Sequence, residues 1–177
     1  MPNSHLKRVR DFGHQLQHNE YIKDMELRDL AERYRDSTEV FLTLVHSLTE
    51  LDLDSADQEG WTPRQVIHHV ADSEAQSYAR LRRLVAEPGT MIQGYDEARW
   101  AENKDLSYKV IEVSHSIAVI AAVRESSYLL LQRLSVDTLN NAGIHSESGA
   151  YSVSDWIETY TRHPLEHAEQ IRKQLKH

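Results

Sequence analysis

The chain has 177 residues, enough for one domain with a substantial core, and its 40% hydrophobic and 27% charged residues are ordinary for a globular protein. The formal net charge is −8 at pH 7 and no long basic run occurs, which argues against nucleic acid as a partner. Because cysteine is absent, disulfides, thiolate zinc sites and cysteine nucleophiles are excluded.

The sequence shows no stretch that resembles a signal peptide or a membrane span. We therefore expect a cytoplasmic protein with no membrane partner. The chain has only six glycines and four prolines, and most of the glycines lie between periodic segments. This distribution predicts long helices joined by a few loops.

The chain begins with a polar segment, residues 1–23, that lacks a clear hydrophobic period and is expected to be a solvated arm. From Asp24, a suitable N-cap, the pattern becomes helical and predicts a helix to about Leu51. Its apolar stripe consists of Leu27, Leu30, Ala31, Tyr34, Phe41, Val45 and Leu48. We expect an acidic connection up to Gly60, and a single domain over residues 24–177.

A second helix has several start signals together. Thr62 can cap it, Pro63 suits the first helical position, and Gln65 completes a capping box. Pro88 should end it. The adjacent histidines His68 and His69 project about 100° apart on this helix, so they cannot both face the core equally. The spacing alone does not decide which of the two points inward.

The segment from Thr90 to Leu106 is too irregular for a long helix, and a loop of this length is often functional. Its aromatic residues, Tyr95 and Trp100, either close over a pocket or anchor the loop to the bundle. A third helix is predicted from about Ser107 to Ser135. Its inward positions are Val110, Val113, Ile117, Ile120, Ala121, Tyr128, Leu131 and Leu134.

Arg124 lies in the middle of that apolar stripe. A charged side chain there needs a partner or a cavity, because an unpaired buried charge is very costly. Two roles remain open. Arg124 could bind an anionic substrate, or it could form a structural ion pair.

The last predicted helix follows a loop from Asn140 to Ala150 and is capped by Ser152, with Asp155 closing a capping box. Its apolar stripe consists of Val153, Trp156, Ile157, Tyr160, Ile171 and Leu175. Pro164 lies inside the helix, where it removes a hydrogen bond to the carbonyl of Tyr160 and should kink or loosen the helix.

His163 and His167 fall within this stripe, four residues apart, so both lie on one inward face about one turn from each other. Two imidazoles at this spacing can converge on one divalent metal. The alternative is a pair of buried histidines satisfied by hydrogen bonds, or a chance pair on the surface. Four such helices with no strand pattern between them predict an all-α fold, a four-helix bundle.

Several motifs in combination resemble the DinB/YfiT-like family over about residues 60–171. One is the segment Trp61-Thr62-Pro63-Arg64-Gln65-Val66-Ile67-His68-His69-Val70-Ala71-Asp72-Ser73. The others are the His163/His167 pair, and the loop with Tyr95-Asp96-Glu97 and Trp100 that is typical of the YfiT-like branch. The family has the four-helix bundle that periodicity already predicts.

The resemblance implies a divalent metal, nickel or zinc with manganese or iron as alternatives, held by three histidines. One is the histidine of the His-Val-Ala-Asp segment, here His69, and the others are His163 and His167. Pro164 departs from relatives that often carry a second histidine at this position, which changes the helix beside the ligands. The resemblance also implies a homodimer.

Three imidazoles leave open coordination positions, as in catalytic sites. The resemblance implies either hydrolysis or transfer of a low-molecular-weight thiol, such as bacillithiol, mycothiol or glutathione, to a small-molecule electrophile. Asp72 and Glu166 could orient ligands or act as bases, and Arg124 could hold a carboxylate-bearing thiol. The competing class is a non-catalytic metal-binding bundle. A di-iron bundle is discarded, because only Glu112-Val113-Ser114-His115 has the required Glu-x-x-His spacing.

Overall fold

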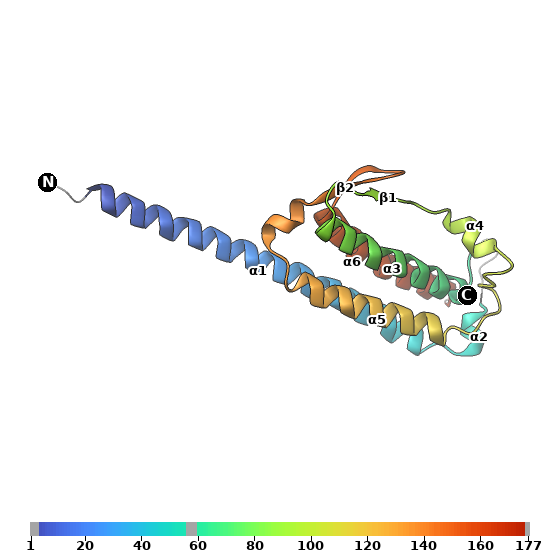
Figure 1. The fold of residues 1–177 in the computed structure, drawn as a ribbon. Coiled ribbons are helices and arrows are strands. Elements are labelled where there is room, and N and C mark those ends of the chain that lie inside the picture. Colours follow the sequence, from blue (N-terminus) through green and yellow to red (C-terminus); the bar gives the residue numbers. More distant parts are fainter. Residues whose placement is uncertain (1–3, 56–59, 176–177) are drawn as a thin grey trace.

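A computed structural model describes residues 4–55 and 60–175, with side chains from Met25 onward. Four long helices form a bundle in which α1 (Ser4–His46) and α3 (Pro63–Ala86) lie diagonally opposite. Each of them packs against both α5 (Ser114–Leu131) and α6 (Val153–Gln174) (Figure 1). The predicted four-helix bundle is confirmed. Within the described residues, no helix combines the length and apolarity needed to cross a bilayer.

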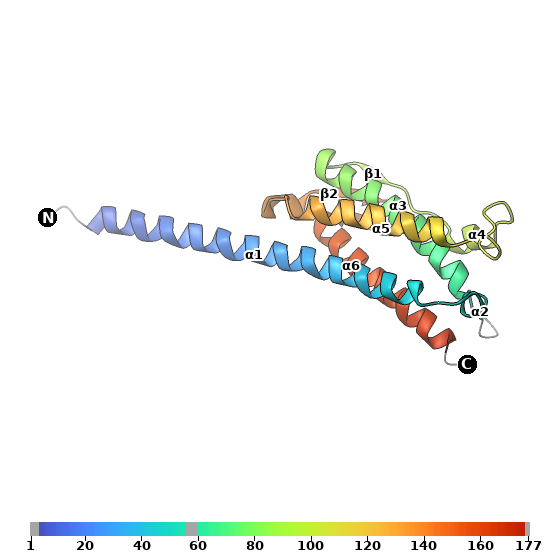
Figure 2. The same ribbon diagram turned by 90° about the horizontal axis from the view of Figure 1, so that it is seen from below.

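The first helix differs from the prediction at both ends. It begins at Ser4 rather than at Asp24, and its N-terminal part continues beyond the bundle (Figures 1 and 2). The loss of the hydrophobic period before Asp24 therefore did not mark a helix boundary, since the helical backbone continues without an apolar stripe. The helix ends at His46, and a short helix α2 (Glu50–Leu53), capped by Thr49, follows. The division into an arm and a bundle domain stays a prediction.

The start of α5 also differs from the prediction, because the helix begins at Ser114 rather than near Ser107. Ser107 has a φ of 55°, in the left-handed region that a right-handed helix cannot use. Val110, predicted to face inward, is 79% exposed. The residues before Ser114 form turns that approach the N-terminal end of α3, where the carbonyl of Ile111 accepts a hydrogen bond from Arg64.

A small sheet, absent from the prediction, lies beside the bundle. Parallel pairing joins β1 (Met91–Ile92) to β2 (Ala142–His145), and antiparallel pairing joins β2 to β3 (Gly149–Ser152). The strands are too short to give an alternating pattern in the sequence. After β1, the short helix α4 (Glu97–Glu102) lies alongside α3 (Figure 1). A 3₁₀ helix, η1 (Val136–Asn140), comes directly before β2. At Gly143 a Cβ atom would lie 2.5 Å from the carbonyl oxygen of Thr90, so β2 can approach this backbone only without a side chain.

The hydrophobic core is divided into two clusters along the bundle. The first contains Leu27, Ala31, Tyr34, Leu81, Leu84, Ile92, Tyr128, Leu131, Val153, Trp156, Ile157 and Tyr160. The second contains Phe41, Val45, Leu53, Val66, Ile67, Val70, Ala71, Val113, Ile120, Ala168 and Ile171. On every long helix a polar residue falls between members of the two clusters: Ser37, Glu74, Arg124 and His163. We call these four residues the polar layer.

Candidate metal centre

The N-terminal part of α3 presents His69. Thr62 and Gln65 form the predicted capping box, with Pro63 at the start of the helix. This firm start fixes the direction in which the following residues project. The His69 side chain is 2% exposed, and its ring lies 5.0 Å from the ring of Trp61.

The other two histidines come from α6, whose predicted capping box between Ser152 and Asp155 is present. His163 and His167 lie one turn apart, with their ring centroids separated by 4.6 Å. Pro164 lies within a helix that continues to Gln174. The carbonyl of Tyr160, left without the amide partner that proline cannot supply, accepts a hydrogen bond of 2.9 Å from Nη1 of Arg124.

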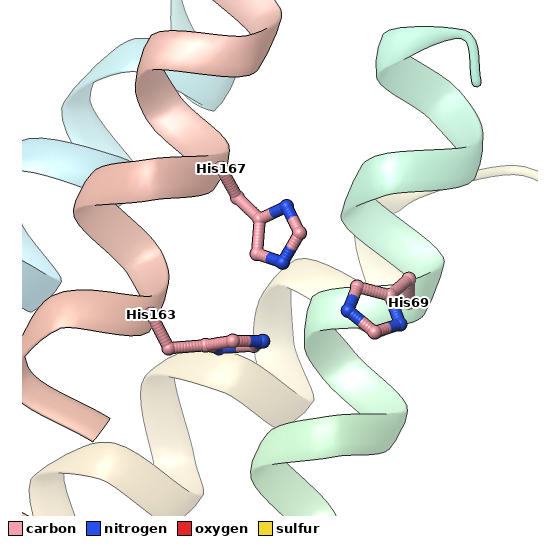
Figure 3. A group of neighbouring side chains, drawn as sticks. All are labelled: His69, His163 and His167. Atoms are coloured by element: carbon pink, nitrogen blue, oxygen red, sulfur yellow. The ribbon is translucent and has the colours of Figure 1, made fainter. Parts of the chain in front are cut away.

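The three histidines meet between α3 and α6, with nitrogen atoms facing a common space (Figure 3). The His69 ring centroid lies 5.6 Å from that of His163 and 4.8 Å from that of His167. One nitrogen atom from each ring lies within 4.8 Å of the others. Imidazole nitrogens bound to one tetrahedral ion lie about 3.3 Å apart for bonds of about 2.0–2.1 Å, so the rings would have to move closer together to share one ion.

Burial in the cluster favours the neutral form of His69 and His167. Burial, with the nearby His167 and His163, lowers the pKa of His69 to about 3. Burial and the neighbouring His163 lower the pKa of His167 to about 4. A metal ligand must present a nitrogen lone pair, which a protonated imidazole lacks. The donor set therefore fits a divalent metal in its ligand type and, at His69 and His167, in its protonation.

Each ring has a protein group at Nδ1, the nitrogen remote from the space shared by the rings. Nδ1 of His167 is 2.8 Å from Oε1 of Gln170, and Nδ1 of His69 is 3.5 Å from the Tyr95 hydroxyl. Nδ1 of His163 is 3.6 Å from Oε1 of Glu74. Such partners of metal-bound histidines fix ring orientation and tautomer.

Glu74 and Arg124 form an ion pair in the middle of the bundle. Both side chains are inaccessible to solvent, and Nη1 of Arg124 lies 2.6 Å from Oε1 of Glu74. Burial would raise the pKa of Glu74, but the guanidinium of Arg124 and the nearby His163 hold it below its ordinary value. The carboxylate is therefore ionised although it is fully buried.

Arg124 uses all five of its N–H donors within the protein. The acceptors are Thr38 Oγ1, Glu74 Oε1, and the Tyr160 carbonyl, Tyr34 carbonyl and Ser37 Oγ. The guanidinium also lies 3.9 Å from the centre of the Tyr34 ring. No donor is left to bind a substrate, so these contacts match the structural alternative rather than the substrate-binding role considered for Arg124.

The other sequence candidates lie in different surroundings. His68 does not join the cluster, because its nitrogens contact Ser116 Oγ at 2.8 Å and the Ile111 carbonyl at 3.2 Å. Asp72 accepts a hydrogen bond from the Tyr108 hydroxyl. Glu166 is exposed and pairs with Arg162 at 2.9 Å, so its carboxylate faces solvent rather than the histidines.

The loop between β1 and α4 contacts His69. Tyr95 places its hydroxyl beside the imidazole, while its ring lies 4.7 Å from the ring of Trp100. Through Tyr95 the loop is therefore in contact with α3, as the anchoring role predicts, and closure of these aromatics over a pocket stays a prediction. Glu97, in the first turn of α4, places Oε2 3.9 Å from Nε2 of His69 and has a 54% exposed side chain.

Sequence reasoning missed Glu74, Gln170 and Glu97 as site residues. A signal for Glu74 was present, because it continues the inward stripe of α3 that contains Val70 and Leu81. A charge on that stripe is the counterpart of the one recognised at Arg124. Gln170 lies three residues after His167, which is a spacing that also occurs by chance on any helix.

Fold and site together define a class: four-helix bundles with a three-histidine cluster suited to a divalent metal. The model of the DinB superfamily matches residues 33–171, and the chain belongs to this family. A relative from Oceanobacillus iheyensis is 32% identical over 159 residues, covering 89% of this chain and 86% of the relative. A relative from Bacillus cereus strain B4264 is 31% identical over 139 residues, covering 75% and 79%. Both are provisionally named metal-dependent hydrolases.

The solved structure of YfiT from Bacillus subtilis is similar to this chain, with a TM-score of 0.76 and 26% sequence identity. The match covers 85% of this chain and 86% of that one. YfiT is described as a probable metal-dependent hydrolase with an unusual four-helix bundle topology. The predicted membership of the DinB/YfiT-like family is thus confirmed.

Proposed function

We propose that the protein is a metal-dependent enzyme in which His69, His163 and His167 hold one divalent ion, zinc or nickel, with manganese or iron as alternatives. The observation that carries this proposal is the convergence of three mostly buried imidazoles from two helices, with nitrogens within 4.8 Å of one another. The names of the relatives in Oceanobacillus and Bacillus support the same class of activity.

A divalent ion in this setting lowers the pKa of water towards about 7, or binds a thiolate. The protein must also supply a group that accepts the proton of the water or thiol. Glu97 has the position for this role, because its half-exposed carboxylate lies beside His69, 3.9 Å from Nε2. Asp72 is less suitable, since it accepts the Tyr108 hydroxyl, and Glu166 is paired with Arg162 at the surface.

Two reactions use this arrangement: hydrolysis of a small ester or amide, and transfer of a low-molecular-weight thiol to an electrophile. The names of the relatives favour hydrolysis, whereas thiol transfer is motivated by the family resemblance described from the sequence. The proposed partner is in either case a small molecule, and the proposed location is the cytoplasm. The alternative is a metal-binding bundle without turnover.

Metal analysis and a reaction screen test the proposal. Purified protein should bind one equivalent of zinc or nickel, and the loaded protein should turn over at least one member of a panel of esters, amides and thiol–electrophile pairs. Glu97→Gln should keep the metal but lower turnover by about 10²–10⁴-fold. Stoichiometric metal without turnover across the panel would favour the non-catalytic alternative, and absence of metal binding would remove the proposal.

A further inference from the structure

We propose that Glu74, fixed by Arg124, is the positioning residue for His163: its carboxylate receives the Nδ1–H and turns Nε2 towards the other two histidines. This inference rests on the proposed metal site. Oε1 of Glu74 lies 3.6 Å from Nδ1 of His163, slightly beyond a normal hydrogen bond. Among the described residues, this buried Nδ1 has no hydrogen-bond partner, so Glu74 is the group placed to accept a hydrogen bond from it.

The carboxylate is held firmly enough to orient a neighbour. Oε1 accepts from Nη1 of Arg124 at 2.6 Å, and Oε2 accepts from Ser77 Oγ at 3.2 Å. Glu74 is 0% exposed and Arg124 is 1% exposed, so water does not compete for these contacts. A residue that is itself locked by packing and hydrogen bonds can fix the rotamer of a ligand.

Pro164 connects this unit to the ligand helix. It follows His163 directly and has no N–H to offer the Tyr160 carbonyl, one turn earlier on α6. Nη1 of Arg124 donates to that carbonyl and to Glu74. The same guanidinium nitrogen therefore holds both the carboxylate and the backbone of the turn that carries His163.

The partner also selects the tautomer of His163. An ionised carboxylate only accepts hydrogen bonds, so contact with Glu74 requires a proton on Nδ1, and the neutral ring in this tautomer offers its Nε2 lone pair to a metal. The corresponding partners of His167 and His69 are the Gln170 amide and the Tyr95 hydroxyl, which are neutral. Among these three contacts, Glu74 supplies the carboxylate–histidine pairing that raises the basicity of a ligand.

The test compares variants of Glu74 by two readouts, neither of which requires turnover. The first is the tautomer of His163 in the metal-free protein, from ¹⁵N chemical shifts of the histidine rings. The second is zinc affinity, from competition with a chromogenic chelator. Wild-type protein should show the Nδ1–H tautomer at His163. Glu74→Gln should weaken zinc binding, since the amide oxygen can still accept a hydrogen bond from Nδ1 but carries no charge.

A double variant, Glu74→Leu with Arg124→Met, removes both charges and so avoids an unpaired buried ion. It should lose the tautomer preference and bind zinc about 10–100-fold more weakly. Ser77→Ala is the matched control, because it removes the contact to Oε2 and leaves Oε1 and its neighbours in place. Its zinc affinity should stay within about twofold of wild type.

The outcomes separate this inference from the proposed metal site. If wild-type protein binds no zinc, the metal site fails, and the tautomer of His163 still reports the role of Glu74. If the folded double variant keeps both the Nδ1–H tautomer and wild-type zinc affinity, the positioning role is overturned even though the metal site stands. If the melting temperature falls while the His163 tautomer and the zinc affinity stay unchanged, the Glu74–Arg124 pair only stabilises the fold, and the positioning role is likewise overturned.

Discussion

At the scale of single residues, burial and mutual proximity set the chemistry of the histidine cluster. Removing imidazoles from water disfavours their charged form, and three of them in one space disfavour it further. The pKa of His69 falls to about 3 and that of His167 to about 4. At neutral pH these side chains therefore need no deprotonation before they bind a metal, so metal uptake releases few protons from them.

Adjacent histidines on α3 allow a matched comparison. His69→Ala should abolish stoichiometric metal binding, because it removes one of three proposed ligands. His68→Ala should leave the stoichiometry near one, because His68 contacts Ser116 and the Ile111 carbonyl outside the cluster. Isothermal titration with zinc checks both variants. Loss of binding in His68→Ala with retention in His69→Ala would reverse the ligand assignment.

Acid should destabilise the metal-free protein before its carboxylates titrate. In the unfolded chain a histidine takes up a proton below about pH 6.5, whereas folded His69 and His167 resist protonation down to about 3 and 4. Stability is therefore full above pH 6.5 and falls as the pH decreases, by roughly 2 kcal/mol per histidine at pH 5.

Chemical denaturation of metal-free protein between pH 7.5 and 4.5 measures this dependence. His167→Gln is the control. It should reduce the slope of stability against pH by the contribution of one protonation. The remaining slope comes from His69 and His68, whose pKa values are also lowered by burial. A wild-type stability that stays constant between pH 7 and 5 would contradict the neutral state of the cluster.

At the scale of elements, Arg124 ties all four long helices together through contacts on α1, α3 and α6. Arg124→Met should lower the free energy of unfolding by about 3–5 kcal/mol, because it leaves the fully buried carboxylate of Glu74 without its partner. For a chain of this size that corresponds to a fall in melting temperature of about 10 °C. KM in the remaining folded protein should stay unchanged.

Arg64→Met is a matched control for this variant. Arg64 is also buried, but its partners Asp54 and Glu50 have side chains that are 60% and 82% exposed, so both carboxylates return to water when the guanidinium is removed. Its melting temperature should fall less than that of Arg124→Met. A raised KM in Arg124→Met at wild-type melting temperature would restore the substrate contact considered from the sequence.

Local signals predicted the elements that have strong caps. Thr62 with Gln65 and Ser152 with Asp155 marked the starts of α3 and α6, and the structure contains both capping boxes. The predicted start of α5 was wrong because Tyr108, Val110, Ile111 and Val113 gave an apolar pattern to a segment of turns, and Ser107 in the left-handed region ends any helix there. The pairing of β1 with β2 joins segments about fifty residues apart, which no local pattern reports, and the β2–β3 hairpin has strands too short to show alternation.

The site was predictable to the extent that it depends on helical spacing. His163 and His167 follow from their four-residue separation, and the choice of His69 over His68 came from resemblance because both are buried on α3. Glu74 was not predictable as the partner of His163, since its contacts with α5 and α6 join residues far apart in the chain.

At the scale of the whole molecule, we predict a homodimer, as the YfiT-like resemblance implies. Light scattering of the purified protein at micromolar concentration should return about twice the 20.5 kDa mass of the chain. The net charge of −8 does not prevent pairing at physiological ionic strength, because charges separated by more than about 8 Å are screened. A mass near that of one chain across the concentration range would exclude the dimer.

The polar layer has a consequence for how the helices are aligned along the bundle axis. Purely apolar helices can slide past one another by one turn, about 5.4 Å, and still bury similar surface. Here such a slip would move Arg124 away from Glu74 and into one of the two apolar clusters, leaving a buried charge unpaired. The free-energy cost of an unpaired charge in a misaligned packing is therefore much larger than the stabilisation that the ion pair gives to the correct one. Because His163 belongs to the same layer, the alignment that avoids this penalty is also the one that brings the three imidazoles to the same height.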